Sequence, residues 1–370
     1  MPNIFEEVGS DTKQVAKTQV AKPDARRAIA RWLMVLFGLV VLIIAIGGLT
    51  RLTDSGLSIT EWNLVMGTVP PMSDAAWAVE FAKYQASPQF QLQNSHMDLA
   101  AFKTIFWWEW GHRQLGRIIG LVWFLGYAWF ALRGQVPGGW HPRLVLVGAL
   151  IGLQGLVGWW MVSSGLVGQM VSVASYRLAV HLGLAFIILG LIAWFVLRLG
   201  KSSVELLQAR RQRDARLMRI AGLFTALVFV QVLLGALVAG IDAGRSFPTW
   251  PLMAGEFLPS ESFDYAPLWS NFFENPSLVQ FNHRLVGYFS FVIGLGIWWN
   301  VRRSPLKSVR RAYGAVVVAL VLQLGLGIGT VLLAAPLDWA LAHQLGAVLL
   351  FVLAIRLRFL ATYPPRQALR

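Results

Sequence analysis

Residues 32–58 read WLMVLFGLVVLIIAIGGLTRLTDSGLS, and this stretch decides the fold. Its first part, residues 32–50, is an apolar run without a charged side chain. About 20 apolar residues in a helix cross the hydrocarbon core of a bilayer. Turn-forming residues follow from Thr53 to Gly56. The stretch therefore predicts a membrane-spanning helix that ends in a polar turn.

The same stretch returns in altered form in the second half of the chain. When Gly47 is set against Gly235, several identities fall into one register, namely Asp54 with Asp242, Gly56 with Gly244, Ser58 with Ser246 and Trp62 with Trp250. Later segments repeat as well: His112–Gly116 resembles His283–Gly287, His181–Gly183 resembles His343–Gly346, and Gln154 with Gly158 resembles Gln323 with Gly327. Such self-similarity indicates an internal duplication.

Apolar runs long enough to span a bilayer occur eight times. They lie near residues 32–50, 115–132, 144–162, 178–197, 219–240, 285–301, 313–334 and 340–357. We therefore expect an all-α polytopic membrane protein with eight transmembrane helices, arranged as two pseudo-symmetric four-helix bundles. Because four spans separate the copies, both copies have the same orientation, which predicts a pseudo-two-fold axis along the membrane normal.

Composition agrees with a membrane protein, since 56% of the 370 residues are hydrophobic, 14% are charged and the mean hydropathy is +0.58. The net charge of +14 does not indicate a nucleic-acid partner, because the basic residues lie in short runs between apolar segments. Under the positive-inside rule these runs place both termini in the cytoplasm. The less basic connections 51–111 and 241–282 then face outward. Cysteine is absent, which excludes thiolate chemistry and disulfides.

These patterns predict five segments. They are a cytoplasmic tail at 1–31, an N-terminal four-helix half at 32–200, a basic cytoplasmic linker at 201–218, a C-terminal four-helix half at 219–358, and a cytoplasmic tail at 359–370. The linker is expected to be a solvated connector, with a basic amphipathic helix on anionic lipid as the alternative.

Four of the six histidines occupy repeated positions: His112, His181, His283 and His343. Each lies near the start of an even-numbered span, so all four are expected at the outward end and at similar depth. A lone histidine there is usually an interfacial residue, but four at one depth indicate a function. Two imidazoles on facing helices can supply the axial ligands of a haem iron. We predict the pairs His112 with His181 and His283 with His343.

Zinc binding is the main alternative to haem binding at these histidines. A catalytic zinc site needs three converging protein ligands, and two separate pairs do not provide them. His96 and His141 have no repeat partner and are read as ordinary surface residues. Arg113 and Arg284 directly follow their histidines and are candidate partners of haem propionates. Interfacial snorkelling is the alternative for both arginines.

The duplication breaks beside the first histidine. Glu109 stands three residues before His112, whereas Gln280 stands three residues before His283. This spacing places both side chains on one helix face. Glu109 is therefore the candidate catalytic residue, able to take a proton or to stabilise positive charge. The alternative is a solvated loop acid. The asymmetry predicts that substrate reacts in the N-terminal half and that the C-terminal half holds a resident cofactor.

At these residues the chain resembles the haem A synthase family, membrane enzymes that complete haem A for cytochrome oxidase. The resemblance covers nearly the whole chain and rests on four motifs: Gly47–Ser58, Glu109–Arg113, Phe281–Arg284 and Ala342–Gln344. It implies oxidation of a porphyrin methyl group of haem O to a formyl group through a hydroxymethyl stage. It also implies haem b, with its iron, at His283 and His343, substrate haem O at His112 and His181, and a catalytic acid at Glu109.

One departure from part of the family concerns cysteine. Some bacterial members carry cysteine pairs in the outer loops, so this chain resembles the cysteine-free proteobacterial and mitochondrial branch. Electrons are then expected to pass through haem from a separate donor, with quinol as a candidate. Further candidate partners are haem O synthase, cytochrome oxidase and membrane lipid. The expected location is the bacterial inner membrane.

Two other functions fit histidine pairs in a membrane protein. One is a di-haem b-type electron carrier, and the other is a haem carrier or assembly factor. The difference between Glu109 and Gln280 argues against two equivalent haems, and ligands on both sides of a macrocycle disfavour quick release.

Overall fold

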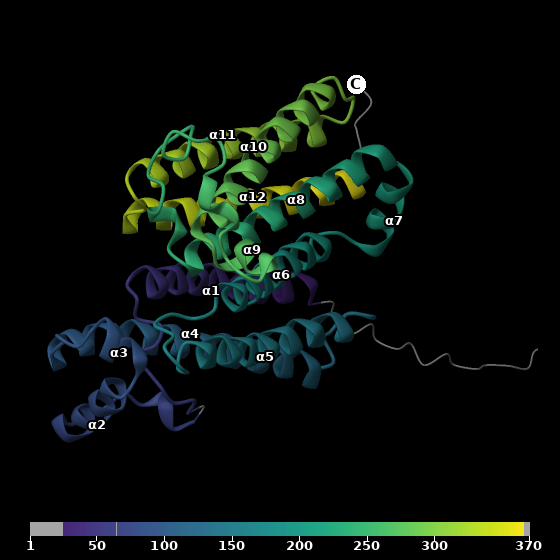
Figure 1. The fold of residues 1–370 in the computed structure, drawn as a ribbon. Coiled ribbons are helices and arrows are strands. Elements are labelled where there is room, and N and C mark those ends of the chain that lie inside the picture. The colour runs from purple at the N-terminus through teal and green to yellow at the C-terminus, as the bar shows by residue number, and fades with distance from the viewer. Residues whose placement is uncertain (1–24, 64, 366–370) are drawn as a thin grey trace, which may run out of the picture.

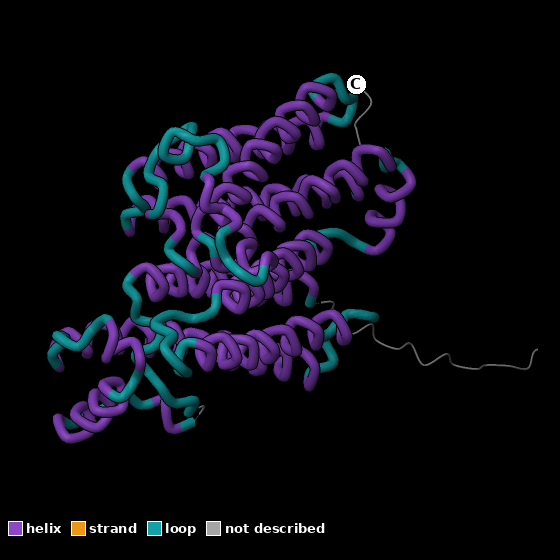
Figure 2. The backbone as a smooth tube through the Cα atoms, viewed as in Figure 1, coloured by secondary structure: helices purple, strands orange, loops and turns teal. Residues whose placement is uncertain are grey.

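The structure, a computed structural model, describes residues 25–63 and 65–365. Over these residues the regular structure is helical, with one isolated bridge between Met253 and Glu256 and no β-strand (Figure 2). The predicted all-α class is therefore confirmed. Most of the predicted tail 1–31 and part of the tail 359–370 lie outside the described residues.

Eight of the helices are long and apolar enough to cross a membrane. They are α1 (Arg26–Leu52), α4 (Leu99–Leu132), α5 (His141–Ser164), α6 (Ser175–Leu199), α8 (Ala215–Gly240), α10 (Pro276–Val301), α11 (Lys307–Leu332) and α12 (Leu337–Thr362). In hydrocarbon a helix satisfies its own backbone hydrogen bonds, which is why apolar runs of this length fold as single helices. The eight predicted spans are confirmed.

The start of α4 differs most from the sequence prediction. The apolar run begins near residue 115, but the helix begins at Leu99, where the Asp98 side chain accepts a hydrogen bond of 2.8 Å from the Ala101 amide. The added turns carry polar residues that a hydropathy pattern misses. Their buried rings, Phe102 and Phe106, pack against the outer loop instead of lipid. His112 consequently lies well inside α4.

The helices form inner and outer layers. Helices α1, α6, α8 and α12 lie in the middle, with α4 and α5 on one side and α10 and α11 on the other (Figure 1). Half of the most apolar window of α6 is buried, compared with 6% for α5. The inner helices therefore pack against protein, whereas the outer helices leave most of their apolar surface for lipid.

The same helix pairs touch in both halves. Helix α1 packs on α4 and α6 as α8 packs on α10 and α12, and the pairs α5 with α6 and α11 with α12 correspond. Helices α6 and α12 meet each other between the halves. This repetition of contacts is consistent with the predicted pair of four-helix bundles.

Short helices fill the connections. The first outer connection contains α2 (Asp74–Gln85) and α3 (Pro88–Leu92), and the second contains α9 (Asn271–Glu274). The basic connection between the halves contains α7 (Ser203–Arg211), which begins with a capping box formed by Ser202 and Glu205.

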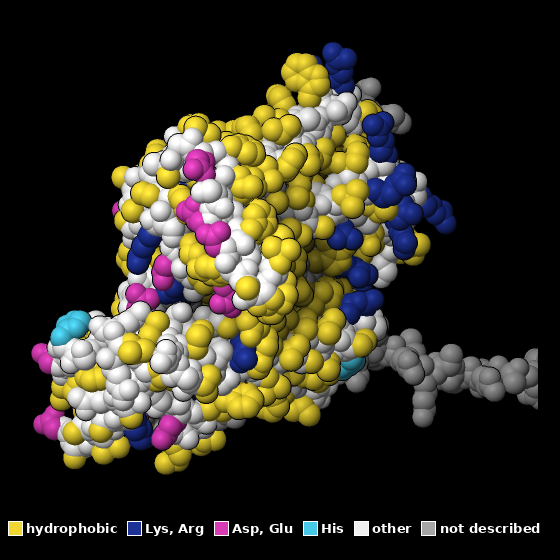
Figure 3. Space-filling view, in the orientation of Figure 1, with side chains coloured by type: hydrophobic (Ala, Val, Ile, Leu, Met, Phe, Trp, Pro, Cys, Tyr) yellow, Lys and Arg dark blue, Asp and Glu magenta, His cyan; other side chains and the backbone are white. Residues whose placement is uncertain are grey.

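Charge is distributed unequally between the two ends of the bundle. In the face shown in Figure 3, Lys and Arg gather at the end that carries α7, and most Asp and Glu side chains lie at the opposite end. Apolar side chains cover much of the surface between them. The orientation of a membrane protein follows its basic connections, so this pattern supports the sequence-based topology.

Arg51, at the end of α1, joins the two halves at their acidic end. Its guanidinium donates to Asp54 Oδ1 at 2.6 Å and to Asp242 Oδ2 at 2.5 Å. The two aspartates are counterparts in the duplication, and both have left-handed backbone angles, with φ of 50° and 55°. One arginine thus holds both copies of the same turn.

Replacing Arg51 by Ala is expected to destabilise the fold. The side chain of Arg51 is only 13% exposed, and the change removes the cation that both aspartates share. Because hydrogen bonds to charged groups contribute about 1.5–3 kcal/mol, R51A should lower stability by about 1–3 kcal/mol. Thermal unfolding in detergent micelles measures this loss as a lower Tm.

Arg245 provides the matched control, since its Nη1 lies 4.0 Å from Asp242 and both side chains are about half exposed. R245A should leave the Tm nearly unchanged. An equal loss in the two variants would contradict the bridging role of Arg51.

Candidate functional site

The structure brings together the two histidine pairs that the sequence predicts. The ring centroids of His112 in α4 and His181 in α6 are 6.5 Å apart, with an interplanar angle of 85°. Those of His283 in α10 and His343 in α12 are 6.2 Å apart, with an angle of 86°. Each half therefore has one pair of facing imidazoles between its helices.

This spacing fits one metal ion held between two imidazoles. A metal–nitrogen bond to histidine is about 2 Å long, and each ring centre lies about 1 Å beyond its nitrogen. Two axial ligands therefore place their centroids about 6 Å apart, close to the observed values. Among residues 25–63 and 65–365 no group of three or more His, Cys, Asp or Glu side chains is placed to hold a metal ion. The donor set suits a haem iron, whose other ligands come from the macrocycle.

Each of these rings lies against a glycine of a neighbouring helix. A β-carbon added at Gly158, Gly235 or Gly327 would lie 3.0, 3.0 and 2.9 Å from Cε1 of His181, His283 and His343, respectively. At Gly47 the added atom would lie 3.3 Å from Nε2 of His112. These glycines leave the space that the rings occupy, which is a more specific role than general helix packing.

Three of the four rings also contact a glutamine. The Nε2 atoms of Gln154, Gln231 and Gln323 lie 3.2, 3.1 and 3.2 Å from Nδ1 of His181, His283 and His343. Each amide also donates to the backbone carbonyl of the same histidine, at 3.0, 2.9 and 2.9 Å. The three Oε1 atoms are buried and have no hydrogen-bond partner. Each glutamine thus contacts both the ring and the backbone of its histidine.

Glu109 is buried, so the alternative of a solvated loop acid is wrong. Its Oε2 accepts hydrogen bonds of 2.8 Å from both the Ser58 hydroxyl and the Ile59 amide. Its Oε1 accepts from Arg113, at 2.6 Å from Nη2 and 3.1 Å from Nε. A carboxylate with only 2% exposure is thus surrounded by donors, one of them a cation.

The corresponding position in the second half has a different environment. Gln280 is equally buried, but its Oε1 has no partner and its Nε2 makes only a 3.5 Å contact with the Gly244 carbonyl. The Nε of Arg284 is also buried without a partner. The sequence difference between Glu109 and Gln280 is therefore a difference between an ion-paired cluster and an incompletely bonded amide.

Both arginines fasten the outer connection of their own half. Arg113 donates to the carbonyls of Ile59 and Glu61, at 2.7 and 2.8 Å. Arg284 donates to the carbonyls of Phe247 and Thr249, at 2.7 and 2.9 Å. These carbonyls are counterparts in the register that aligns Gly47 with Gly235. Interfacial snorkelling does not describe such contacts, and a role toward propionates stays a prediction.

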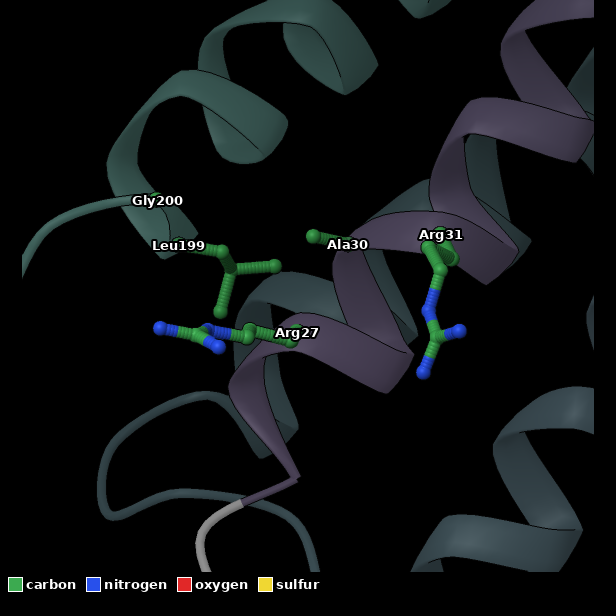
Figure 4. A pocket seen from close by; sticks show the side chains of 5 residues that line it. All are labelled: Arg27, Ala30, Arg31, Leu199 and Gly200. Carbon is green, nitrogen blue, oxygen red and sulfur yellow. The ribbon is translucent and has the colours of Figure 1, made fainter.

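Two openings lie near opposite ends of the helices. One, of about 230 Å³, is beside the Glu109 cluster and is lined by residues that include Trp62, Arg113 and Trp159. Another, of about 490 Å³, lies between the start of α1 and the end of α6, where Arg27, Arg31 and Leu199 line it (Figure 4). Only the first adjoins the site.

The two remaining histidines lie away from these pairs. His141 begins α5, where its Nδ1 is 3.1 Å from the Tyr127 hydroxyl. His96 is exposed in the first outer connection. Both locations agree with the expectation that His96 and His141 are ordinary surface residues.

Sequence reasoning missed Ser58 as a partner of Glu109 and Gln231 as a partner of His283. A signal for Gln231 was present, because Gln231 precedes Gly235 by four residues, as Gln154 precedes Gly158 and Gln323 precedes Gly327. Ser58 had no comparable signal, since a contact across 51 residues depends on tertiary structure.

Together, these features define a class: a polytopic helical membrane protein with a facing histidine pair in each of two related halves and a buried acid in only one. The chain belongs to the COX15-CtaA family, described as "Cytochrome oxidase assembly protein", whose model matches residues 30–355. This assignment agrees with the resemblance seen in the sequence motifs.

Similar proteins span the whole chain. A "Heme A synthase" of Dinoroseobacter shibae is 56% identical, covering 100% of this chain and 98% of that protein. One from Paracoccus denitrificans is 57% identical, covering 94% of this chain and 91% of that protein. A third, from Ruegeria sp. (strain TM1040), is 54% identical over 99% of this chain and 98% of that protein.

The glycine against His343 provides a test of haem binding. G327A should displace the ring and reduce bound haem by about one per chain, because the new methyl group meets Cε1 at 2.9 Å. Haem content per purified chain, from the absorbance of the extracted haem, measures this loss.

G325A is the matched control in the same helix, since no atom lies within 4 Å of a β-carbon added there. It should bind haem as the unaltered protein does. Equal haem content in the two variants would count against His343 as a ligand.

Proposed function

We propose that this protein is a haem A synthase, which oxidises a methyl group of haem O to a formyl group through a hydroxymethyl intermediate, for cytochrome oxidase. The observation that carries the proposal is the buried Glu109 cluster, which stands beside only one of two otherwise similar histidine pairs. The relatives named "Heme A synthase", at 54–57% identity, support the same reaction.

The two pairs have separate tasks in this proposal. His112 and His181 would hold the substrate haem O, whereas His283 and His343 would hold a resident haem b, which would supply electrons. Haem supplies the redox chemistry, and the protein supplies orientation and charge around it. Centroid distances of 6.5 and 6.2 Å suit axial ligation in both halves.

Glu109 acts on the substrate side as a fixed negative charge. Ser58, Ile59 and Arg113 hold its two oxygens in place, so little reorganisation is needed when positive charge develops near it. The same carboxylate can accept a proton from the reacting group. Gln280 offers neither property to the second half.

The outer connection excludes water from the reacting centre. Arg113 joins residues 59–61 to α4, and its guanidinium lies 5.6 Å from the ring centre of Trp62. The opening of about 230 Å³ beside them is the proposed entrance to the substrate site.

Arg284 is the better placed of the two candidate propionate partners. Its buried Nε has no partner, whereas the equivalent atom of Arg113 bonds Glu109. A propionate of the resident haem would complete this donor.

We place the protein in the bacterial inner membrane, with both termini in the cytoplasm and both histidine pairs toward the outer face. The basic end of the bundle supports this orientation. The proposed partners are a separate electron donor, with quinol as the candidate, together with haem O synthase and cytochrome oxidase.

The E109Q variant tests the division of tasks. It should keep its bound haem but stall oxidation, because glutamine preserves the shape of the side chain and removes its charge. We expect haem A formation to fall by about 10²-fold or more, in line with removal of an acid–base or charge-stabilising group. Chromatography and mass spectrometry of extracted haems from cells supplying haem O measure this change.

If E109Q produces haem A at the normal rate, Glu109 is not the catalytic residue and the division of tasks between the two pairs loses its main support. Q280E serves as the control in the other half and should leave the extracted haems unchanged.

The H283A variant tests the resident site. Loss of one axial ligand should remove haem b, while haem O remains bound at the other pair. The ratio of the two extracted haems per chain gives the result. H141A, which alters a histidine outside the pairs, is the control. Equal loss of both haems in H283A would contradict separate sites.

A further inference from the structure

The four histidine rings are not supported equally. A glutamine one helical turn before the glycine contacts His181, His283 and His343. At His112 the equivalent residue is Ile43, four residues before Gly47. Among the described residues no side chain forms a hydrogen bond with the His112 ring. One of the four rings is therefore held without a hydrogen bond to a side chain.

Ile43 occupies the same place in space as the missing glutamine. A β-carbon added at Gly116 would lie 3.7 Å from Cδ1 of Ile43. At Gly287, the counterpart of Gly116, the added atom would lie 3.2 Å from Nε2 of Gln231. The two side chains thus fill equivalent positions between α1 and α4 and between α8 and α10. The difference is chemical, because an isoleucine replaces an amide.

The amide matters because of the second nitrogen of a ligating imidazole. A metal-bound histidine usually donates its other ring N–H to a neighbour, which orients the ring and makes it a stronger ligand. Loss of such a neighbour typically costs 10–100-fold in metal affinity. In the structure the atom of each glutamine nearest the ring is Nε2, which also donates to the carbonyl of the same histidine, so each glutamine orients its ring. Isoleucine offers neither a donor nor an acceptor.

We propose that Ile43 makes His112 the weak, exchangeable ligand, so that haem at the first pair is anchored by His181 and released through His112. This inference rests on the proposed function, in which the first pair holds substrate. A substrate haem must leave after each reaction, whereas a resident haem must stay. The pair His283 and His343 has two glutamines, and the pair His112 and His181 has one.

Ile43 is a positioning residue in this scheme, since it acts on the haem only through His112. Its effect is distinct from that of Glu109, which lies three residues before His112 in α4 and accepts hydrogen bonds from Ser58 and Ile59 of the outer connection. Holding and releasing the haem are thus controlled from α1, whereas charge beside the reacting group is controlled from α4.

The test is the rate at which each haem leaves the intact protein. Protein purified with haem O and haem b is mixed with an excess of a haem-free globin, and the haems remaining on the membrane protein are extracted and identified over time. The unaltered protein should lose haem O faster than haem b. In I43Q the loss of haem O should slow by about 10-fold or more, with haem b unchanged.

The reverse exchange is made in the other half. Q231I should accelerate loss of haem b by about 10-fold or more and leave haem O unchanged. I43L is the control for packing and should behave as the unaltered protein. The low-spin ferric EPR signal of the first site should shift in I43Q and not in I43L, which a purely structural change would not produce.

The inference stands only if I43Q slows the loss of haem O and Q231I accelerates the loss of haem b. Unchanged rates, or faster loss of haem O from I43Q, overturn it. If I43Q does not fold, Q231I decides alone, and an unchanged rate for haem b overturns the inference. Failure to form haem A would instead overturn the proposed reaction, because the dissociation rates do not depend on turnover.

Discussion

Close approach between an imidazole and a glycine is the contact on which the site depends. A ring of this size fits between two packed helices only where the opposite helix has no side chain, as at Gly158 and Gly327. The same contact fixes the depth at which each pair faces across its bundle. The rings of each pair lie 6.2–6.5 Å apart, a spacing that suits a single metal ion between them.

The duplication gives each half such imidazole–glycine contacts, and a few substitutions give the two sites different chemistry. Glu109 forms an ion-paired cluster with Arg113 and Ser58, while Gln280 leaves its own Oε1 unpaired. Ile43 and Gln231 also differ. They lie four residues before Gly47 and Gly235, but only Gln231 carries a polar side chain. In a low-dielectric interior such single exchanges have large effects, because no water replaces a lost charge or hydrogen bond. The packing of the helices can therefore stay the same while the two sites diverge.

The halves also depend on each other through polar contacts at their interface. Arg51 binds both copies of the aspartate turn, and the Gln344 amide donates to the Ile44 carbonyl at 2.7 Å. In the first half, Leu182 occupies the position that corresponds to Gln344 in the second half. The interface is thus asymmetric as well, and it links the first helix of one half to the last helix of the other.

The eight spans, the duplication and the four repeated histidines could be predicted from the sequence, because hydropathy and repeated motifs are local properties of the chain. It also located Glu109, an acid whose counterpart Gln280 is neutral. The folded structure was needed to show that Ser58 bonds Glu109 and that Gln231 contacts His283. These contacts join residues on different helices or loops, so the packing of those elements, which no local pattern encodes, decides them.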